Sequence, residues 1–205
     1  MLPITTILSV AAAFFPPSAI NVGVSSFAVA PQIQVVQNDV PLVLPAVPVV
    51  PFYSQFKDIQ SPKWQKVGCG VTSLAMIIEY YKPDTVSANT LLEKGVARGA
   101  YDKNAGWIYV GLIGLSQEYG LDGDFYDLGK LGPKAALEQF KKYSKDGPVI
   151  ASVHYKLDPK NPIPHLIVVN GIDDETVYYN DPASKEGGQE ISVDDFLKAW
   201  KKRFI

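Results

Sequence analysis

The 205-residue chain offers few side chains for catalysis, because it contains one cysteine and two histidines. Cys69 lies between Gly68 and Gly70, at the start of an apolar stretch with helical spacing. Glycine on both sides lets the backbone turn tightly and leaves the sulfur unshielded. The free N–H groups of a helix start favour a thiolate and could hold an oxyanion formed when sulfur attacks a carbonyl. The alternative for Cys69 is a small buried hydrophobe, the commonest fate of a lone cysteine.

A histidine and an aspartate from the second half of the chain complete a pattern suited to nucleophilic acyl transfer. His165 begins an apolar strand, and Asp181 follows the next predicted strand. If the turn between the strands takes three residues, 173–175, the two side chains are diagonal neighbours on one face, within ~7–8 Å. A two-residue turn would put them on opposite faces. The alternatives are a strand-end histidine with a satisfied hydrogen bond and a turn-forming aspartate before Pro182.

The other ionisable groups do not form a pattern typical of a metal site or a cofactor site, so neither a metal nor a cofactor is predicted. His154 ends a predicted strand and precedes a loop rich in lysine and proline, which indicates a loop-edge or cleft residue rather than the base. One cysteine and two scattered histidines do not make a zinc site. The acids at 122–127 lack the glycine spacing and the terminal bidentate acid of a calcium-binding EF-hand loop.

Composition indicates a folded domain and excludes several classes of partner. Hydrophobic residues make up 47% and charged residues 20% of the chain, so a packed core can form. A formal net charge of −2 argues against an electrostatic grip on nucleic acid or anionic lipid. The single cysteine also excludes an internal disulfide framework.

The first part of the chain differs in composition from the rest. Asp39 is the only charged residue before Lys57. The apolar run 7–15 has the length of a signal-peptide core and is shorter than the ~20 residues of a membrane-spanning helix. Residues 1–30 are therefore predicted to be a signal peptide or leader, with export to the cell envelope or beyond. The alternative is a cytoplasmic protein whose leader has no function.

The next segment is predicted to be a linker that leads into one globular domain. Residues 31–47 include closely spaced prolines, which lack N–H donors and favour extended backbone. The domain is predicted to span 48–205, with no stable membrane span in the mature domain.

Periodicity predicts helices first and antiparallel strands afterwards, which is typical of an α+β domain with helices packed on one side of a sheet. The predicted helices run from Cys69 to Lys82, from about Ser87 to Gly99, Trp107 to Tyr119, Pro133 to Tyr143 and Val193 to Lys201. The predicted strands are 148–153, 165–172 and 176–180.

Five segments occur in a characteristic order along the chain. They are Val-Pro-Phe-Tyr-Ser-Gln at 50–55, Gly-Cys-Gly-Val-Thr-Ser-Leu-Ala-Met-Ile-Ile at 68–78, Gly-Pro-Val-Ile at 147–150, His-Leu-Ile-Val-Val-Asn-Gly at 165–171 and Tyr-Asn-Asp-Pro at 179–182. As an ordered set they resemble the bacterial C39-like peptidase domains, over residues 48–201. These are papain-like cysteine peptidases, related to the leader-cleaving peptidase domain of bacteriocin-exporting transporters.

The resemblance implies a papain-like fold and a role for each site residue. Cys69 would be the nucleophile, His165 the general base and acid, and Asp181 the group that orients the imidazole. Gln55 would help line the oxyanion hole, with Gln65 as the alternative because it is nearer the cysteine in sequence.

The resemblance also implies the reaction and the partner, namely hydrolysis of amide bonds in a peptide or protein substrate through a thioester. Gly68 is a departure, because transporter-linked relatives usually carry aspartate there. Two alternatives are a non-catalytic papain-like module that binds peptides or cell-wall components, and a related amidase or transamidase.

Overall fold

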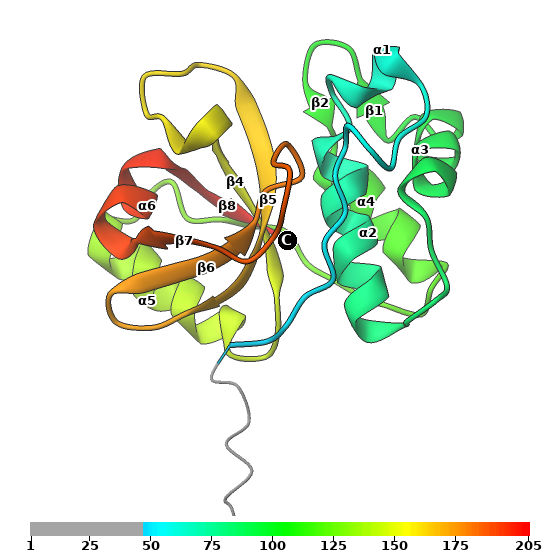
Figure 1. Cartoon of the computed structure of the whole chain (residues 1–205). Coiled ribbons are helices and arrows are strands. Elements are labelled where there is room, and N and C mark those ends of the chain that lie inside the picture. The colour runs from blue at the N-terminus through cyan, green and yellow to red at the C-terminus, as the bar shows by residue number, and fades with distance from the viewer. Residues whose placement is uncertain (1–46) are drawn as a thin grey trace, which may run out of the picture. The chain divides into compact units, whose positions relative to one another are not determined.

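The structure, a computed structural model, describes residues 47–205 (Figure 1). The predicted leader and residues 31–46 of the predicted linker lie outside the described residues. We call the two halves of the described part the helical lobe and the sheet lobe.

The helical lobe contains the first four helices and a small hairpin. Their bounds are α1 (Pro62–Gln65), α2 (Cys69–Tyr81), α3 (Ala88–Ala97), α4 (Tyr109–Gln117), β1 (Tyr101–Asp102) and β2 (Gly106–Trp107). The long helix α2 is the centre of this lobe, and eight of its residues are buried.

Sequence periodicity predicted the three longer helices of this lobe, but it missed the four-residue α1 and placed the start of α4 too early. Helix α2 has the predicted bounds to within a residue, and Ser87 caps α3 by accepting a hydrogen bond from the Thr90 N–H. Helix α4 begins at Tyr109, not at Trp107, because Trp107 pairs with Tyr101 in the β1–β2 hairpin. Local periodicity missed a hairpin whose strands are only two residues long.

The sheet lobe is a six-stranded antiparallel sheet with two helices and a short 3₁₀ turn, η1 (Tyr155–Leu157). The strand order is β3-β8-β4-β5-β6-β7. The bounds are β3 (Tyr126–Asp127), α5 (Pro133–Ser144), β4 (Val149–His154), β5 (Pro164–Ile172), β6 (Thr176–Asn180), β7 (Gln189–Ser192), α6 (Val193–Ala199) and β8 (Trp200–Phe204).

The two faces of strand β5 belong to two different cores. Leu166 and Val168 are buried in the core that includes α2, whereas Ile167 and Val169 are buried in the core that includes α5 and α6. The α+β class is thus as predicted. The expectation that helices lie on one side of the sheet is wrong, because α5 and α6 cover the other face (Figure 1).

The last strand was also missed by the sequence prediction, which extended the final helix to Lys201. Helix α6 ends at Ala199, and β8 enters the sheet between β3 and β4. Only Trp200 and Phe204, at the two ends of β8, are buried, and both pack against Phe140 of α5.

A bulge in the pairing of β5 with β6 compensates for a turn that is one residue shorter than the three-residue turn considered from the sequence. Next to the turn, Ile172 pairs with Val177 and the Asp173 N–H bonds to the Thr176 carbonyl, so the turn has two residues rather than three. Between Val169 and Gly171 the register shifts by one residue. Beyond this bulge Val168 pairs with Asn180, which is the register that a three-residue turn would produce.

Candidate active site

Cys69 is the first residue of α2, and its packing explains the two glycines beside it. Neither glycine has a positive φ, so the expected reason for them, a tight turn, is wrong. A Cβ on Gly68 would lie 2.2 Å from Ile59 Cδ1, and a Cβ on Gly70 would lie 2.5 Å from Trp107 Cγ. Close packing against the Trp107 side chain therefore favours glycine at position 70, whereas a side chain at position 68 would require the end of the buried Ile59 side chain to move.

The start of α2 provides the electrostatic setting that the sequence predicted for the sulfur. Cys69 is half-buried and is the only free cysteine. No side chain caps this helix, because the N-cap residue is Gly68. The positive end of the helix dipole and uncapped N–H groups are thus available to a negative charge at this point.

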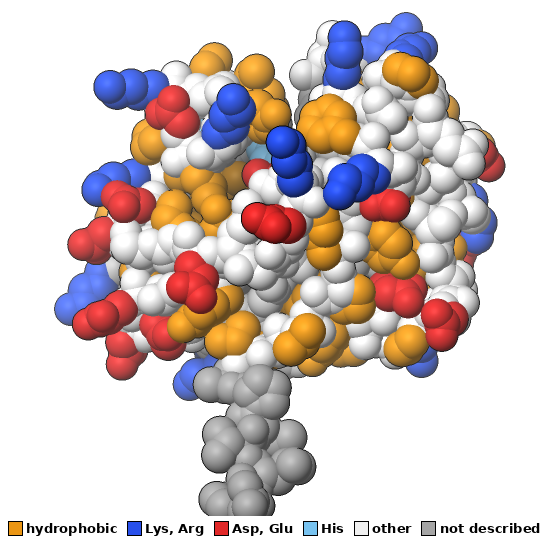
Figure 2. All heavy atoms as spheres, viewed as in Figure 1, with side chains coloured by type: hydrophobic (Ala, Val, Ile, Leu, Met, Phe, Trp, Pro, Cys, Tyr) orange, Lys and Arg blue, Asp and Glu red, His pale blue; other side chains and the backbone are white. Residues whose placement is uncertain are grey.

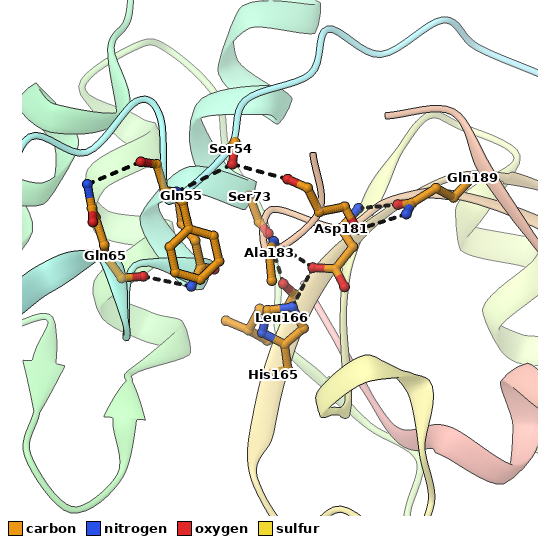
Figure 3. Close-up of polar contacts among 11 residues, drawn as sticks. Ser54, Gln55, Gln65, Ser73, His165, Leu166, Asp181, Ala183 and Gln189 are labelled. Carbon is orange, nitrogen blue, oxygen red and sulfur yellow. Dashed lines mark hydrogen bonds and ion pairs between the residues drawn. The ribbon is translucent and has the colours of Figure 1, made fainter. Parts of the chain in front are cut away.

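His165 and Asp181 are brought together by the bulged pairing of β5 and β6. His165 Nε2 lies 2.6 Å from Asp181 Oδ1, and the side chains face each other in Figure 3. Both residues are buried, at 4% and 7% exposure. The same carboxylate oxygen accepts a hydrogen bond from the Ala183 N–H at 2.7 Å, so the carboxylate is held from two sides.

Two groups act on the pKa of the imidazole against the effect of burial. Burial lowers the pKa of His165, but interaction with the Asp181 carboxylate and with the Cys69 thiol raises it to about 9. Because Nε2 is taken by Asp181, Nδ1 is the ring nitrogen left for the sulfur. The pKa favours an imidazolium at neutral pH, which is the partner that a thiolate requires.

We expect protonation of His165 to stabilise the fold most at acid to neutral pH. The folded-state pKa of about 9 exceeds the ordinary value of 6.5, so the folded chain binds the proton more tightly than the unfolded chain. The contribution is fully present below pH 6.5 and is lost as pH rises through about 9. Urea unfolding across this range should show a falling free energy of unfolding. An equally steep fall in His165→Gln would contradict the assignment.

A buried hydrogen bond joins the two lobes close to Cys69 and His165. Ser73, one turn after Cys69 in α2, is fully buried, and its hydroxyl donates to the Leu166 carbonyl at 3.2 Å (Figure 3). Leu166 adjoins His165 in β5. The helix that carries the sulfur is therefore tied directly to the strand that carries the imidazole, by a residue that sequence analysis did not single out.

The two glutamines considered for the oxyanion hole have different surroundings (Figure 3). Gln55 is 3% exposed and lines the cleft with Cys69. Its Nε2 donates to the Gln65 carbonyl at 2.7 Å, which leaves one amide proton unused. The Gln65 amide donates to the carbonyls of Phe56 and Ile59, and Gln65 is not among the residues that line the cleft.

A cleft of about 470 Å³ between the lobes contains Cys69 and His165. Figure 2 shows the hollow between the two halves. The β1–β2 hairpin forms part of one wall, and Trp107 anchors it by donating to the Val67 carbonyl at 2.6 Å. Neither the hairpin nor this anchor was predicted, although a turn-forming Asn-Ala-Gly sequence at 104–106 was a local signal.

The opposite wall comes from the loop between β4 and β5. Tyr155 lines the cleft and packs edge-on against His165, with ring centroids 5.1 Å apart and an interplanar angle of 90°. Lys156 and Leu157, which follow it, both have positive φ, a strained conformation for these residue types. Sequence analysis did not single out Tyr155 either.

The remaining histidine is the last residue of β4, at the base of this loop, and does not line the cleft. His154 Nδ1 lies 2.6 Å from the Asn161 carbonyl, so the side chain closes the base of the loop. Within residues 47–205 no three His, Cys, Asp or Glu side chains form a group that could hold a metal ion. The described helices are all too short or too polar to cross a bilayer.

Comparisons with known proteins agree with this architecture. Two solved structures share the fold. A double glycine motif protease from an AMS/PCAT transporter, in complex with the leader peptide, is 24% identical with a TM-score of 0.52, and the match covers 77% of this chain and 90% of that one. A C39-like peptidase from Bacillus anthracis is 20% identical with a TM-score of 0.51, covering 76% and 94%.

The family to which the chain belongs is shown by a match between its sequence and a family model. No curated protein is significantly similar to this chain. The model of the Peptidase C39-like family matches residues 48–204. Since this match includes every element described above and the residues of the cleft, the chain belongs to the Peptidase C39-like family.

Proposed function

We propose that this protein is a cysteine peptidase that hydrolyses amide bonds in peptides or protein tails. The observation that carries the proposal is the buried pair of His165 and Asp181, 2.6 Å apart, whose imidazole lines the same cleft as Cys69 at the uncapped start of α2. Family and fold support a peptidase-type function. The leader peptide bound to one structural relative supports a peptide as the substrate class.

In the proposed reaction, His165 holds the proton of the Cys69 thiol as an imidazolium, and the thiolate Sγ attacks the carbonyl carbon of the scissile amide. The backbone N–H of Cys69 and the free amide proton of Gln55 hold the resulting oxyanion. His165 then donates its proton to the leaving amine, and the C–N bond breaks to leave a thioester. Water, deprotonated by His165, hydrolyses that thioester and releases the acid and the free thiol.

Asp181 has a positioning role in this scheme. Its carboxylate accepts from Nε2 and thereby directs Nδ1 at the sulfur, as well as stabilising the imidazolium. The Ala183 N–H and the Gln189 side chain, which accepts from the Asp181 N–H at 3.2 Å, hold the aspartate in place.

Thiol alkylation tests the proposal without knowledge of the substrate. We expect iodoacetamide to modify Cys69 at about pH 6–7 at least tenfold faster than it modifies glutathione, because the imidazolium and the helix start favour thiolate. Intact mass measured over time gives the rate. His165→Ala should slow the reaction to that of a free thiol.

Three outcomes separate this proposal from its alternatives. Slow alkylation that His165→Ala leaves unchanged would contradict the activated thiol and leave a binding module. Fast alkylation with cleavage of a peptide library supports the peptidase. Fast alkylation with deamidation or amide exchange, and no cleavage, would indicate an amidase or transamidase instead.

A further inference from the structure

Besides the thiol and imidazole of the proposed reaction, the ionisable side chains that carry charge in the cleft lining are all positive. Lys66 and Lys103 line the cleft, and no aspartate or glutamate does. Neither lysine forms an ion pair with any carboxylate of residues 47–205. The cleft therefore carries positive charge that is not neutralised at close range.

The aspartates in the neighbouring segments accept hydrogen bonds from backbone N–H groups of their own loops. Asp58 accepts from the Ser54 N–H at 2.6 Å, and Asp158 accepts from the Lys160 N–H at 2.9 Å. Asp102 accepts from the N–H groups of Asn104 and Ala105, which lower its pKa. These carboxylates shape the walls of the cleft and do not line it.

A further lysine lies beside the lining. Lys156 Nζ lies 5.9 Å from the ring centroid of Tyr155, which lines the cleft. Figure 2 shows blue side chains at the rim of the hollow between the lobes, with red side chains among them. A cleft lined with one sign of charge focuses the field and attracts ligands of the opposite sign.

The wall that carries Lys103 is held by an aromatic cluster. The Tyr101 ring packs against Trp64 and Trp107, with centroids 5.1 and 5.3 Å apart. Apolar side chains in the same lining remain exposed, namely Phe56 at 45% and Ile163 at 55%. The lining thus combines apolar contact surface with two unpaired ammonium groups.

We infer that the cleft selects peptides that carry a carboxylate within reach of Lys66 and Lys103, flanked by apolar residues. This inference deepens the proposed peptidase function and rests on it. The carboxylate belongs either to an Asp or Glu side chain or to the carboxyl terminus of the peptide, since both present the same group to an ammonium.

A binding assay with full-length Cys69→Ala tests the inference, because this variant binds peptides without cleaving them. The probes are fluorescein-labelled octapeptides of Ala, Leu and Gly, with Glu or Gln placed at each position in turn. A second set compares a free carboxyl terminus with an amide. We expect the best Glu peptide, or the free acid, to bind about two- to fivefold tighter than its neutral match, the effect of one solvent-exposed ion pair.

Neutralising the two lysines should remove this preference. Lys66→Gln and Lys103→Gln are each combined with Cys69→Ala. Each should bring the ratio of the affinity for the acidic peptide to that for the neutral peptide towards one, through a loss of affinity for the acidic peptide alone. Lys142→Gln is the matched control, since Lys142 is an exposed lysine of α5 that does not line the cleft. Added salt should also reduce the ratio.

Equal affinity for acidic and neutral peptides, or a loss in the lysine variants that is the same for both, would overturn the inference. Hydrolysis of the same peptides by the unsubstituted protein tests the proposed function separately. Selective binding without any cleavage would contradict the peptidase and keep the acidic preference. Cleavage without an acidic preference would contradict this inference alone.

Discussion

Replacing Cys69 with alanine should abolish peptide hydrolysis, with a loss of turnover on the order of 10⁴–10⁶-fold, because no other thiol exists in the chain. His165→Ala should produce a loss of similar size. Residues that act as one unit are strongly non-additive, so the double variant should be no slower than either single variant. A fluorogenic peptide identified from a library, followed over time, measures these rates.

The controls for this experiment follow from the packing around the two residues. Cys69 is half-buried at a helix start, so removing its sulfur should leave the thermal unfolding midpoint close to that of the unsubstituted chain. The His154→Ala variant is the matched histidine control, because His154 closes a loop and does not line the cleft. Activity that survives Cys69→Ala, or disappears equally in His154→Ala, would contradict the assignment.

Gln55→Ala should lower turnover by about 10²–10³-fold, the usual effect of losing one oxyanion donor. Gln55 lines the cleft and has one amide proton free, whereas both amide protons of Gln65 are used by backbone carbonyls. Steady-state kinetics should show the loss in kcat and not in KM, because the oxyanion exists only along the reaction path.

Gln65→Ala is the matched comparison and should act on stability instead. Its amide holds the carbonyls of Phe56 and Ile59, so its removal should lower the free energy of unfolding by about 1–3 kcal/mol. Turnover per folded molecule should change little. A large fall in kcat for Gln65→Ala, with Gln55→Ala near normal, would assign the oxyanion hole to Gln65.

Several elements were predictable from local sequence because local forces decide them. The apolar spacing after Cys69 predicts α2, and Ser87 predicts the start of α3 through its side-chain cap. Strand β6 has the predicted bounds, since its β-branched and aromatic residues lie between clear turn signals. In each case the residues that determine the element lie within the element or next to it.

Other elements depend on partners that are distant in the chain. Strand β8 is mostly polar and forms because β3 and β4 lie on either side of it. The hairpin of β1 and β2 has two-residue strands, and its Tyr101 is held between Trp64 and Trp107. No periodicity within these segments could have indicated them, because the energy that forms them comes from tertiary contacts.

For the candidate site, the amino-acid sequence on its own specified the residue types: one thiol before a helix, one imidazole at a strand start, and one carboxylate after the next strand. The tertiary structure decided whether they could meet. The bulge between Val169 and Gly171 turns Asp181 to the His165 face, and the Ser73 bond to Leu166 ties α2 to β5. The bulge depends on the pairing register of two adjacent strands, which turn signals alone do not fix, and the Ser73 bond joins residues 93 positions apart, which local sequence does not encode.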